Sequence, residues 1–210
     1  MDREEAGPAA VASVGGVPLT AGDHVCALYR GHAERDQLLS PFFADGLRDG
    51  HICLLLAARN DGGAFSDAQA AELPSADGTP GHLQIKEPQE SYLLNGTFDG
   101  DGMLDLLHTW SAGFRHEAGR FARLAADMSW AGPLVQPAFI QEVLRYETKA
   151  TRWLRSNPLV GVCMYDLELF SGDLIIPMVK AHPKVWFGGR VVENPYCPAP
   201  GTESGPTARG

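Results

Sequence analysis

The chain has 210 residues and a formal net charge of −9, with 44% hydrophobic and 20% charged residues. This length suits one domain with a substantial core, and the composition is that of a globular protein rather than a disordered one. The acidic balance argues against recognition of a phosphate backbone, which needs clustered Lys and Arg side chains. We therefore expect no direct contact with nucleic acid.

The two ends of the chain differ in composition from the rest. Residues 1–14 are acidic and Ala-rich, and residues 198–210 are rich in Pro, Gly, Ser and Thr. Such segments bury too little apolar surface to order themselves, so we expect two disordered tails around one domain, residues 15–197.

The N-terminus lacks the pattern of a signal peptide, the four cysteines form no CxxC motif, and no apolar segment could span a bilayer. These features predict a cytoplasmic protein with reduced thiols and no membrane contact.

Strand-like and helix-like segments alternate between the tails. This pattern is typical of a three-layer α/β fold, with a mainly parallel sheet flanked by helices. Apolar spacing predicts strands at residues 23–29, 51–58, 82–87, 120–131, 159–167 and 184–192. It predicts helices at residues 34–48, within 61–73, and at 102–118, 137–154 and 171–182, the last interrupted by Pro177.

The first strand and helix are joined by the turn RGHAERD, residues 30–36, at a place where phosphate-binding loops occur. The turn has one glycine, no GK[ST] motif, and two acidic side chains, Glu34 and Asp36. If the scaffold is that of a nucleotide hydrolase, its phosphate loop has been lost. An ordinary turn in which Glu34 complements the helix dipole is the alternative.

His24 and Cys26 lie two residues apart on the first strand, so their side chains should point to the same face. Both suit zinc or another borderline metal, but a site needs three or four ligands. The others would have to come from His51, His182, Cys163 or an acidic residue, which spacing cannot identify. A buried thiol beside a hydrogen-bonded histidine and one wall of a ligand pocket remain alternatives. A nucleophilic cysteine is disfavoured because no oxyanion motif is present.

Polar and aromatic residues also follow the predicted strands. Tyr29 ends the first, Trp130 follows the fourth, and Tyr165 with Asp166 ends the fifth. Ligands of open α/β sheets bind outside the carboxyl ends of the strands, so a ligand site is expected there. Aromatic residues that merely cap the core are the alternative.

Five segments, taken in order, resemble the DcmR-like sensory family, also called the MEDS (methanogen/methylotroph DcmR sensory) domain. They are DHVCALYRGHAERDQLLSPFFADGLRDGHICLLLA, IKEPQESYL, RLAADMSWA, VLRYETKATRWL and VCMYDLELFSGDLIIPMVKAHPKVWFGGRVVENPYC. The resemblance implies a prokaryotic sensory module for small hydrocarbon derivatives, with a fold similar to RecA/KaiC-type ATPases and a degenerate phosphate loop. The matching positions, which the resemblance marks as ligand-binding, are His24, Cys26, Tyr29, Trp130, Glu147, Tyr165, Asp166 and His182. His51 departs from a position that is commonly acidic in similar sequences.

We therefore expect a non-catalytic ligand-binding module, with His24 and Asp166 orienting a polar group of the ligand. No helix-turn-helix or kinase pattern is present, so the signal is expected to pass to a separate partner such as a kinase or transcription regulator. Two other classes remain open. One is a RecA-like nucleotide-binding enzyme or a metal-dependent enzyme built on His24 and Cys26; the other is a ligand-independent interaction module. The identity of any cofactor is left open.

Overall fold

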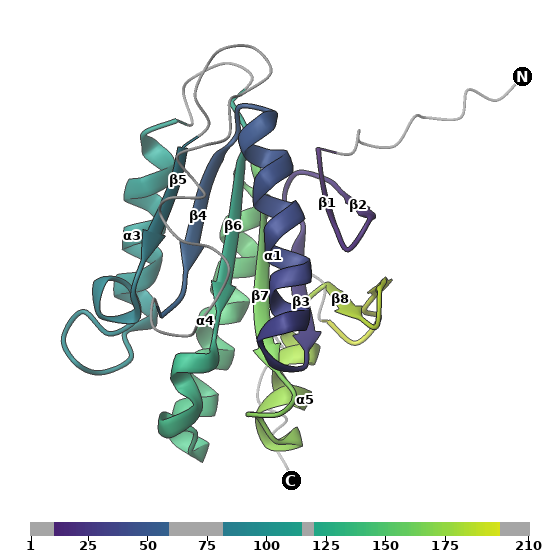
Figure 1. Ribbon diagram of the computed structural model, residues 1–210. Coiled ribbons are helices and arrows are strands. Elements are labelled where there is room, and N and C mark those ends of the chain that lie inside the picture. Colours follow the sequence, from purple (N-terminus) through teal and green to yellow (C-terminus); the bar gives the residue numbers. More distant parts are fainter. Residues whose placement is uncertain (1–10, 59–81, 115–119, 198–210) are drawn as a thin grey trace, which may run out of the picture.

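A seven-stranded sheet forms the centre of the protein in the computed structural model, which describes residues 11–58, 82–114 and 120–197 (Figure 1). The strand order is β5-β4-β6-β7-β3-β8-β9, and all neighbouring strands are parallel except β8 and β9. The strands are β3 (His24–Tyr29), β4 (Ile52–Leu56), β5 (His82–Lys86), β6 (Ala122–Asp127), β7 (Leu159–Asp166), β8 (Lys184–Phe187) and β9 (Arg190–Glu193). The prediction of a mainly parallel α/β sheet is confirmed.

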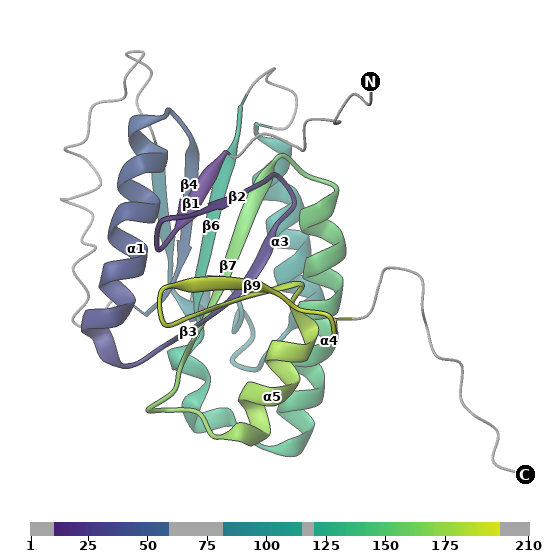
Figure 2. The same cartoon turned by 90° about the vertical axis from the view of Figure 1, so that its right-hand side faces the viewer.

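Helices cover both faces of this sheet. Figure 2 shows α1 (Gly31–Arg48) on one face, and α3 (Gly100–Ala112), α4 (Pro137–Arg155) and α5 (Gly172–Ala181) on the other. Two short 3₁₀ turns, η1 (Pro88–Glu90) and η2 (Ser129–Leu134), follow β5 and β6. None of the helices in the described ranges is both long enough and apolar enough to cross a membrane.

The sheet divides the core into two layers, because side chains alternate along each strand. Val25, Ala27 and Tyr29 of β3 pack on the α1 side, together with Phe42 and Phe43 of that helix. Cys26 and Leu28 belong to the layer beneath α3, α4 and α5. Every residue of β3, β6 and β7 is buried, as expected for continuous apolar strands that are covered on both faces.

Several elements differ from the sequence-based expectations. Helix α5 runs through Pro177 without interruption, since its buried face of Leu174, Met178 and Ala181 outweighs one lost backbone hydrogen bond. The last predicted strand is two strands, β8 and β9, which turn at Gly188 and Gly189 with φ of 57° and 80°. Such positive φ values favour glycine and suit a tight hairpin.

A second hairpin was not predicted. Strands β1 (Ala12–Val14) and β2 (Val17–Leu19) turn at Gly15 and Gly16, and β1 packs against α1. β1 lies in the range that composition assigned to the N-terminal tail. The short helix expected within residues 61–73 lies outside the described residues.

Candidate functional site

Four polar side chains from four separate elements converge between the sheet and helices α4 and α5. His24 is the first residue of β3, Glu147 lies on α4, Cys163 lies on β7, and His182 directly follows α5. All four are buried, with relative exposures of 1%, 0%, 6% and 0%. One nitrogen, oxygen or sulfur atom of each lies within 4.8 Å of those of the other three. We call these four residues the buried polar cluster.

The distances inside the buried polar cluster are short. Nε2 of His24 lies 3.3 Å from Sγ of Cys163 and 3.5 Å from Oε2 of Glu147. Nε2 of His182 also lies 3.5 Å from Oε2 of Glu147, and the two imidazole ring centroids are 4.1 Å apart. The thiol of Cys163 faces the same oxygen at 3.6 Å. Oε2 of Glu147 is therefore the common neighbour of the other three side chains.

Outer hydrogen bonds fix the orientation of these groups. Nδ1 of His24 lies 2.7 Å from the hydroxyl of Thr151, and that hydroxyl donates to the backbone oxygen of Glu147 at 3.0 Å. Nδ1 of His182 lies 2.7 Å from the backbone oxygen of Met178. The phenol of Tyr165 donates to Oε1 of Glu147 at 2.7 Å. Both imidazoles thus direct Nε2 toward the centre of the cluster.

Burial controls protonation in the cluster. Desolvation lowers the pKa of His24 well below its usual value, and the neighbouring His182 lowers it further, so the ring is neutral near pH 7. Burial also raises the pKa of the Cys163 thiol and of the Tyr165 phenol, and the Glu147 carboxylate adds to both shifts. The close contact of His24 with Glu147 is therefore not an ordinary salt bridge.

The structure brings together several residues that the sequence singled out. His24 and Cys26 share a face of β3, as the alternation of strand side chains predicted. Glu147 and His182 contact His24, and Tyr165 contacts both Glu147 and His182. Cys26 itself lies outside the buried polar cluster. The thiol beside His24 belongs to Cys163, which pairs with Cys26 across the β3–β7 ladder.

Tyr29 and Asp166 lie elsewhere. Tyr29 faces the α1 layer, where its phenol donates to Oδ1 of Asp127 at 3.0 Å. Arg35 of α1 donates to Oδ2 of the same carboxylate, also at 3.0 Å. Oδ1 of Asp166 accepts a 3.3 Å hydrogen bond from the backbone N–H of Gly31, at the start of α1. The sheet thus separates Tyr29 from His24, so the eight predicted residues do not line one pocket.

Trp130 belongs to a group of aromatic rings between β6, α3 and α4, which we call the aromatic cluster. Its ring stacks on Tyr92 with centroids 5.0 Å apart, and Phe98 packs edge-on against Phe139 and Tyr146 at 5.4 and 6.0 Å. The members are Tyr92, Phe98, Trp130, Phe139 and Tyr146. Sequence reasoning identified only Trp130, because the other rings come from loops and a helix whose packing the spacing does not reveal.

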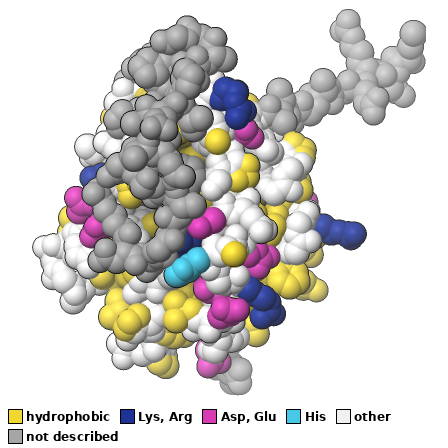
Figure 3. Space-filling model, viewed as in Figure 1, with side chains coloured by type: hydrophobic (Ala, Val, Ile, Leu, Met, Phe, Trp, Pro, Cys, Tyr) yellow, Lys and Arg dark blue, Asp and Glu magenta, His cyan; other side chains and the backbone are white. Residues whose placement is uncertain are grey.

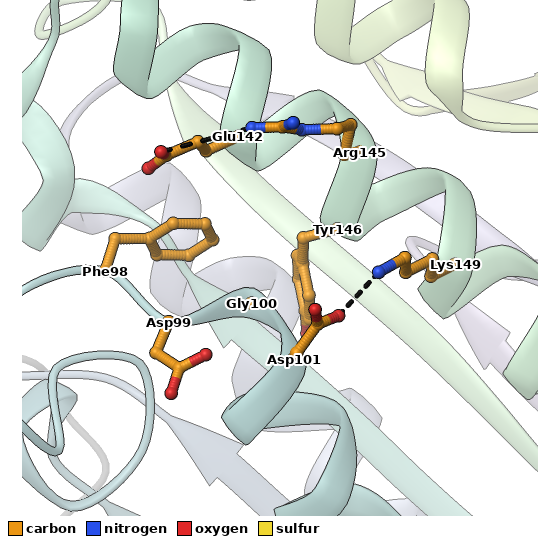
Figure 4. A pocket seen from close by; sticks show the side chains of 8 residues that line it. All are labelled: Phe98, Asp99, Gly100, Asp101, Glu142, Arg145, Tyr146 and Lys149. Atoms are coloured by element: carbon orange, nitrogen blue, oxygen red, sulfur yellow. Dashed lines mark hydrogen bonds and ion pairs between the residues drawn. The ribbon is translucent and has the colours of Figure 1, made fainter.

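Two surface hollows adjoin the aromatic cluster. The first, of about 280 Å³, lies between α3 and α4, where Phe98 and Tyr146 face each other below the Glu142–Arg145 ion pair (Figure 4). The second, of about 510 Å³, lies beside η2 and shares Phe98 and Glu142 with the first. Tyr146 is the direct chain neighbour of Glu147, and the Glu147 carboxylate adds to the effect of burial in raising the pKa of the Tyr146 phenol. The aromatic cluster therefore extends from the surface hollows to the chain neighbour of Glu147.

His51, the residue that departs from similar sequences, directly precedes β4 and packs against Phe121 in the α1-side layer of the core. Its Nδ1 accepts a 3.0 Å hydrogen bond from Nε of Arg123, a buried side chain of β6 that also donates to the backbone oxygen of Phe42. This position takes no part in either cluster.

The fold is that of an α/β domain, and comparison with known families places this domain in a class of sensory domains. The chain belongs to the MEDS family, described as the methanogen/methylotroph DcmR sensory domain, whose model matches residues 23–183. That range contains the whole buried polar cluster.

A particular relative is the transcriptional repressor DcmR of Methylorubrum extorquens (strain DSM 6343 / CIP 106787 / DM4), which is 29% identical over 175 residues. The match covers 83% of this chain and 63% of the repressor, so the chain spans less than two thirds of that protein. Because the relative is a repressor, the comparison does not support our expectation that this chain makes no contact with nucleic acid. On the face shown in Figure 3, the visible Lys and Arg side chains lie apart from one another among Asp and Glu. The expectation stays a prediction.

Proposed function

We propose that this chain is a non-catalytic sensory module for transcription control that binds a small, largely apolar molecule, such as a hydrocarbon derivative, at the aromatic cluster. One observation carries this proposal. Phe98 and Tyr146 line a surface hollow and at the same time belong to an aromatic cluster that ends beside the buried polar cluster.

The chemistry of the aromatic cluster suits such a ligand. Ring faces and edges give apolar contact area, and the two hollows, of about 280 and 510 Å³, are of the size that small molecules occupy. Nε1 of Trp130 is buried and has no hydrogen-bond partner within the described ranges. This indole N–H is a donor for a polar or halogen group of the ligand.

The buried polar cluster forms the inner end of the proposed site. Helix α4 carries both Tyr146 and Glu147. A ligand that displaces the Tyr146 ring therefore also shifts Glu147, and with it the contacts of Glu147 with His24 and His182. His24, Cys26, Tyr165 and His182 then respond to the ligand rather than touch it at the surface. Tyr29 and Asp166 hold the start of α1, and they transmit the change to that helix.

The absence of catalysis in this proposal has two supports. Cys163 is buried and the pKa of its thiol is raised, which is the opposite of what a nucleophilic thiolate requires. The amides that begin α1 are occupied by carboxylates of the chain, since Glu34 accepts from Arg30 N at 2.7 Å and Asp166 accepts from Gly31 N at 3.3 Å. This arrangement agrees with kinship to RecA/KaiC-type folds whose phosphate loop is degenerate, and it disfavours a bound triphosphate.

The remaining parts of the proposal follow the sequence-based expectations. The module acts in the cytoplasm and passes its signal to a separate output protein, such as a kinase or a transcription regulator. A nucleotide-binding enzyme and a ligand-independent interaction module are the competing functions, and ligand binding separates both from our proposal.

Thermal unfolding of the purified chain with small alcohols, halogenated hydrocarbons and nucleotides tests the proposal. A ligand at about 100 times its Kd stabilises the folded state by about 2.7 kcal/mol, which for a domain of this size is a rise in Tm of roughly 5–10 °C. We expect this rise with at least one member of the first two classes and none with nucleotides. Isothermal titration calorimetry then gives the affinity.

A pair of tryptophan variants makes the test specific. Trp130→Phe keeps an aromatic ring and removes the N–H, so it should weaken the binding of that ligand. Trp186→Phe is the matched control, because Trp186 also has a buried Nε1 without a partner among the described residues, but packs in the α1 layer. Stabilisation by nucleotides alone, or equal loss of affinity in both variants, would contradict the proposed site.

A further inference from the structure

With both imidazoles neutral and Glu147 ionised, the buried polar cluster contains more hydrogen-bond acceptors than hydrogens. Met178 offers a carbonyl oxygen, which can only accept, so Nδ1 of His182 carries the hydrogen of that 2.7 Å bond and Nε2 has a free lone pair. When Thr151 donates its hydroxyl hydrogen to the backbone oxygen of Glu147, 3.0 Å away, it accepts from Nδ1 of His24. Nε2 of His24 therefore also presents a lone pair to the centre of the cluster.

With both imidazoles neutral and Glu147 ionised, one hydrogen serves these acceptors. The two Nε2 atoms and Oε2 of Glu147 face one another, and the thiol of Cys163 supplies the single proton. Nε2 of His182 has no hydrogen-bond partner within the described part of the chain, although the side chain is completely buried. An unpaired buried acceptor beside a carboxylate is costly, so the centre of the cluster calls for a positive charge.

We propose that the buried polar cluster is a zinc site in which His24, Glu147, Cys163 and His182 each supply one ligand atom. Two imidazole nitrogens, a thiolate and a carboxylate oxygen are ligands that zinc takes in proteins. Zinc binding releases the thiol proton of Cys163 to solvent. With a thiolate and a carboxylate as ligands the dication is neutralised, which suits a buried centre.

The geometry of the donor atoms agrees with tetrahedral coordination. With Zn–N near 2.0 Å, Zn–O near 2.1 Å and Zn–S near 2.3 Å, the donor atoms of a tetrahedral site are about 3.3–3.6 Å apart. Nε2 of His24 lies 3.3 Å from the Cys163 sulfur and 3.5 Å from Oε2 of Glu147. The same Glu147 oxygen lies 3.5 Å from Nε2 of His182 and 3.6 Å from the Cys163 sulfur. The other two pairs, His182 with His24 and His182 with Cys163, lie within 4.8 Å, so any closing of the tetrahedron falls on the His182 side chain.

The outer hydrogen bonds are those of a metal centre. A histidine that binds metal through one nitrogen commonly donates from the other to a carbonyl, hydroxyl or carboxylate, and both histidines do so here, to Thr151 and Met178. The oxygen of Glu147 that does not face the cluster accepts from Tyr165. With four protein ligands and no exposed position, the site is a closed, structural one rather than a catalytic one.

Metal binding is tested on the full chain without any small-molecule ligand, so its outcome is independent of the proposed sensory function. The purified chain is stripped with a chelator, titrated with Zn²⁺, and analysed for metal by mass spectrometry. We expect one zinc per chain and a rise in thermal stability on addition of the metal. Titration with Co²⁺ reports the coordination, because tetrahedral Co²⁺ absorbs visible light and a bound thiolate adds a charge-transfer band in the near ultraviolet.

Two cysteine variants separate the proposed ligand from its neighbour. Cys163→Ser should abolish the thiolate-to-cobalt band, whereas Cys26→Ser should retain it, because Cys26 is equally buried on the same face but outside the cluster. Thr151→Val removes the outer hydrogen bond to His24 together with the bond from the hydroxyl to the backbone oxygen of Glu147, and leaves all four proposed ligands in place. It should weaken zinc binding by about 10–100-fold while the fold is kept. If a proton alone occupied the centre of the cluster, the wild-type chain would take up neither Zn²⁺ nor Co²⁺. That result would overturn the inference. So would a charge-transfer band that persists without Cys163.

Discussion

Arg123 donates from Nε to Nδ1 of His51 at 3.0 Å, so the imidazole must give up this hydrogen bond to take a second proton. Burial and the adjacent guanidinium lower the pKa of His51 from 6.5 to about 4, against a smaller opposing effect of Asp49. The unfolded chain therefore binds a proton at this residue between pH 6.5 and 4, while the folded chain does not.

Stability should accordingly fall as the pH is lowered from 7 to 4. Because His51 is partly exposed, solvent screening reduces the contribution of this residue to roughly 1 kcal/mol. His51→Gln retains an acceptor for Arg123 and should flatten the pH dependence by about that amount. Urea unfolding at several pH values measures the effect, and equal slopes for the two proteins would refute it.

Arg123 itself should matter much more than its ionic partner. Its side chain is 2% exposed and donates to Phe42 O, while Asp49, with which it forms a 3.1 Å ion pair, is 52% exposed. Arg123→Met leaves the carbonyl of Phe42 and Nδ1 of His51 without their donor, at a cost of roughly 2–3 kcal/mol. Asp49→Asn should cost at most about 1 kcal/mol, as for other exposed ion pairs. Chemical denaturation of both variants checks the contrast, and similar losses would contradict it.

The carboxylate of Asp127 organises the turn between β3 and α1. It accepts from Tyr29 and Ser129 on one oxygen and from Arg35 on the other. Asp127→Asn leaves the buried guanidinium of Arg35 without its most buried counter-charge, so we expect a loss of about 3 kcal/mol. Tyr29→Phe removes one hydroxyl donor and should cost about 1 kcal/mol. Equilibrium unfolding followed by tryptophan fluorescence distinguishes these values, and the reverse order would exclude a central role for Asp127.

Gly46 lies where α1 passes over Arg123. A Cβ at this position would come within 2.6 Å of Cδ and 2.8 Å of Nε of Arg123, and within 3.1 Å of Sγ of Cys53. Gly46→Ala should therefore destabilise the chain by roughly 1–3 kcal/mol through overpacking, although alanine favours helix.

Gly172, at the first turn of α5, is the matched control. An added Cβ there meets only Ile176, at 3.7 Å, so Gly172→Ala should be neutral or stabilise by up to about 1 kcal/mol. Melting temperatures of the two alanine variants provide the measurement. A stable Gly46→Ala protein would show that α1 can shift away from the sheet.

Periodicity was sufficient to predict the sheet and its main helices. The continuous apolar runs of β4 and β7 indicated strands buried on both faces, and the apolar face of α4 marked a helix within one residue of its ends. The two hairpins were missed because their strands are only three or four residues long. The pairs Gly15-Gly16 and Gly188-Gly189 carried the signal that would have revealed both turns.

The candidate site could be predicted only in part. Alternation along β3 correctly placed His24 and Cys26 on one face. That Cys163 and Glu147 join His24 depends on the register of β7 and the rotation of α4, which no local spacing encodes. The family resemblance grouped Tyr29 with His24, although the two differ by an odd number of positions on one strand and so face opposite layers.

The same alternation makes the buried polar cluster a marker for strand register. A slip of β3 by one residue against β7 would turn His24 and Cys26 toward α1 and bring Val25 and Ala27 beneath α4. Glu147 would then face apolar side chains, and the phenol of Tyr29 would lose Asp127. The slipped register would thus lose polar contacts on both faces of the sheet. The polar residues that form the site therefore also stabilise the one register of β3 and β7 in which the site can form.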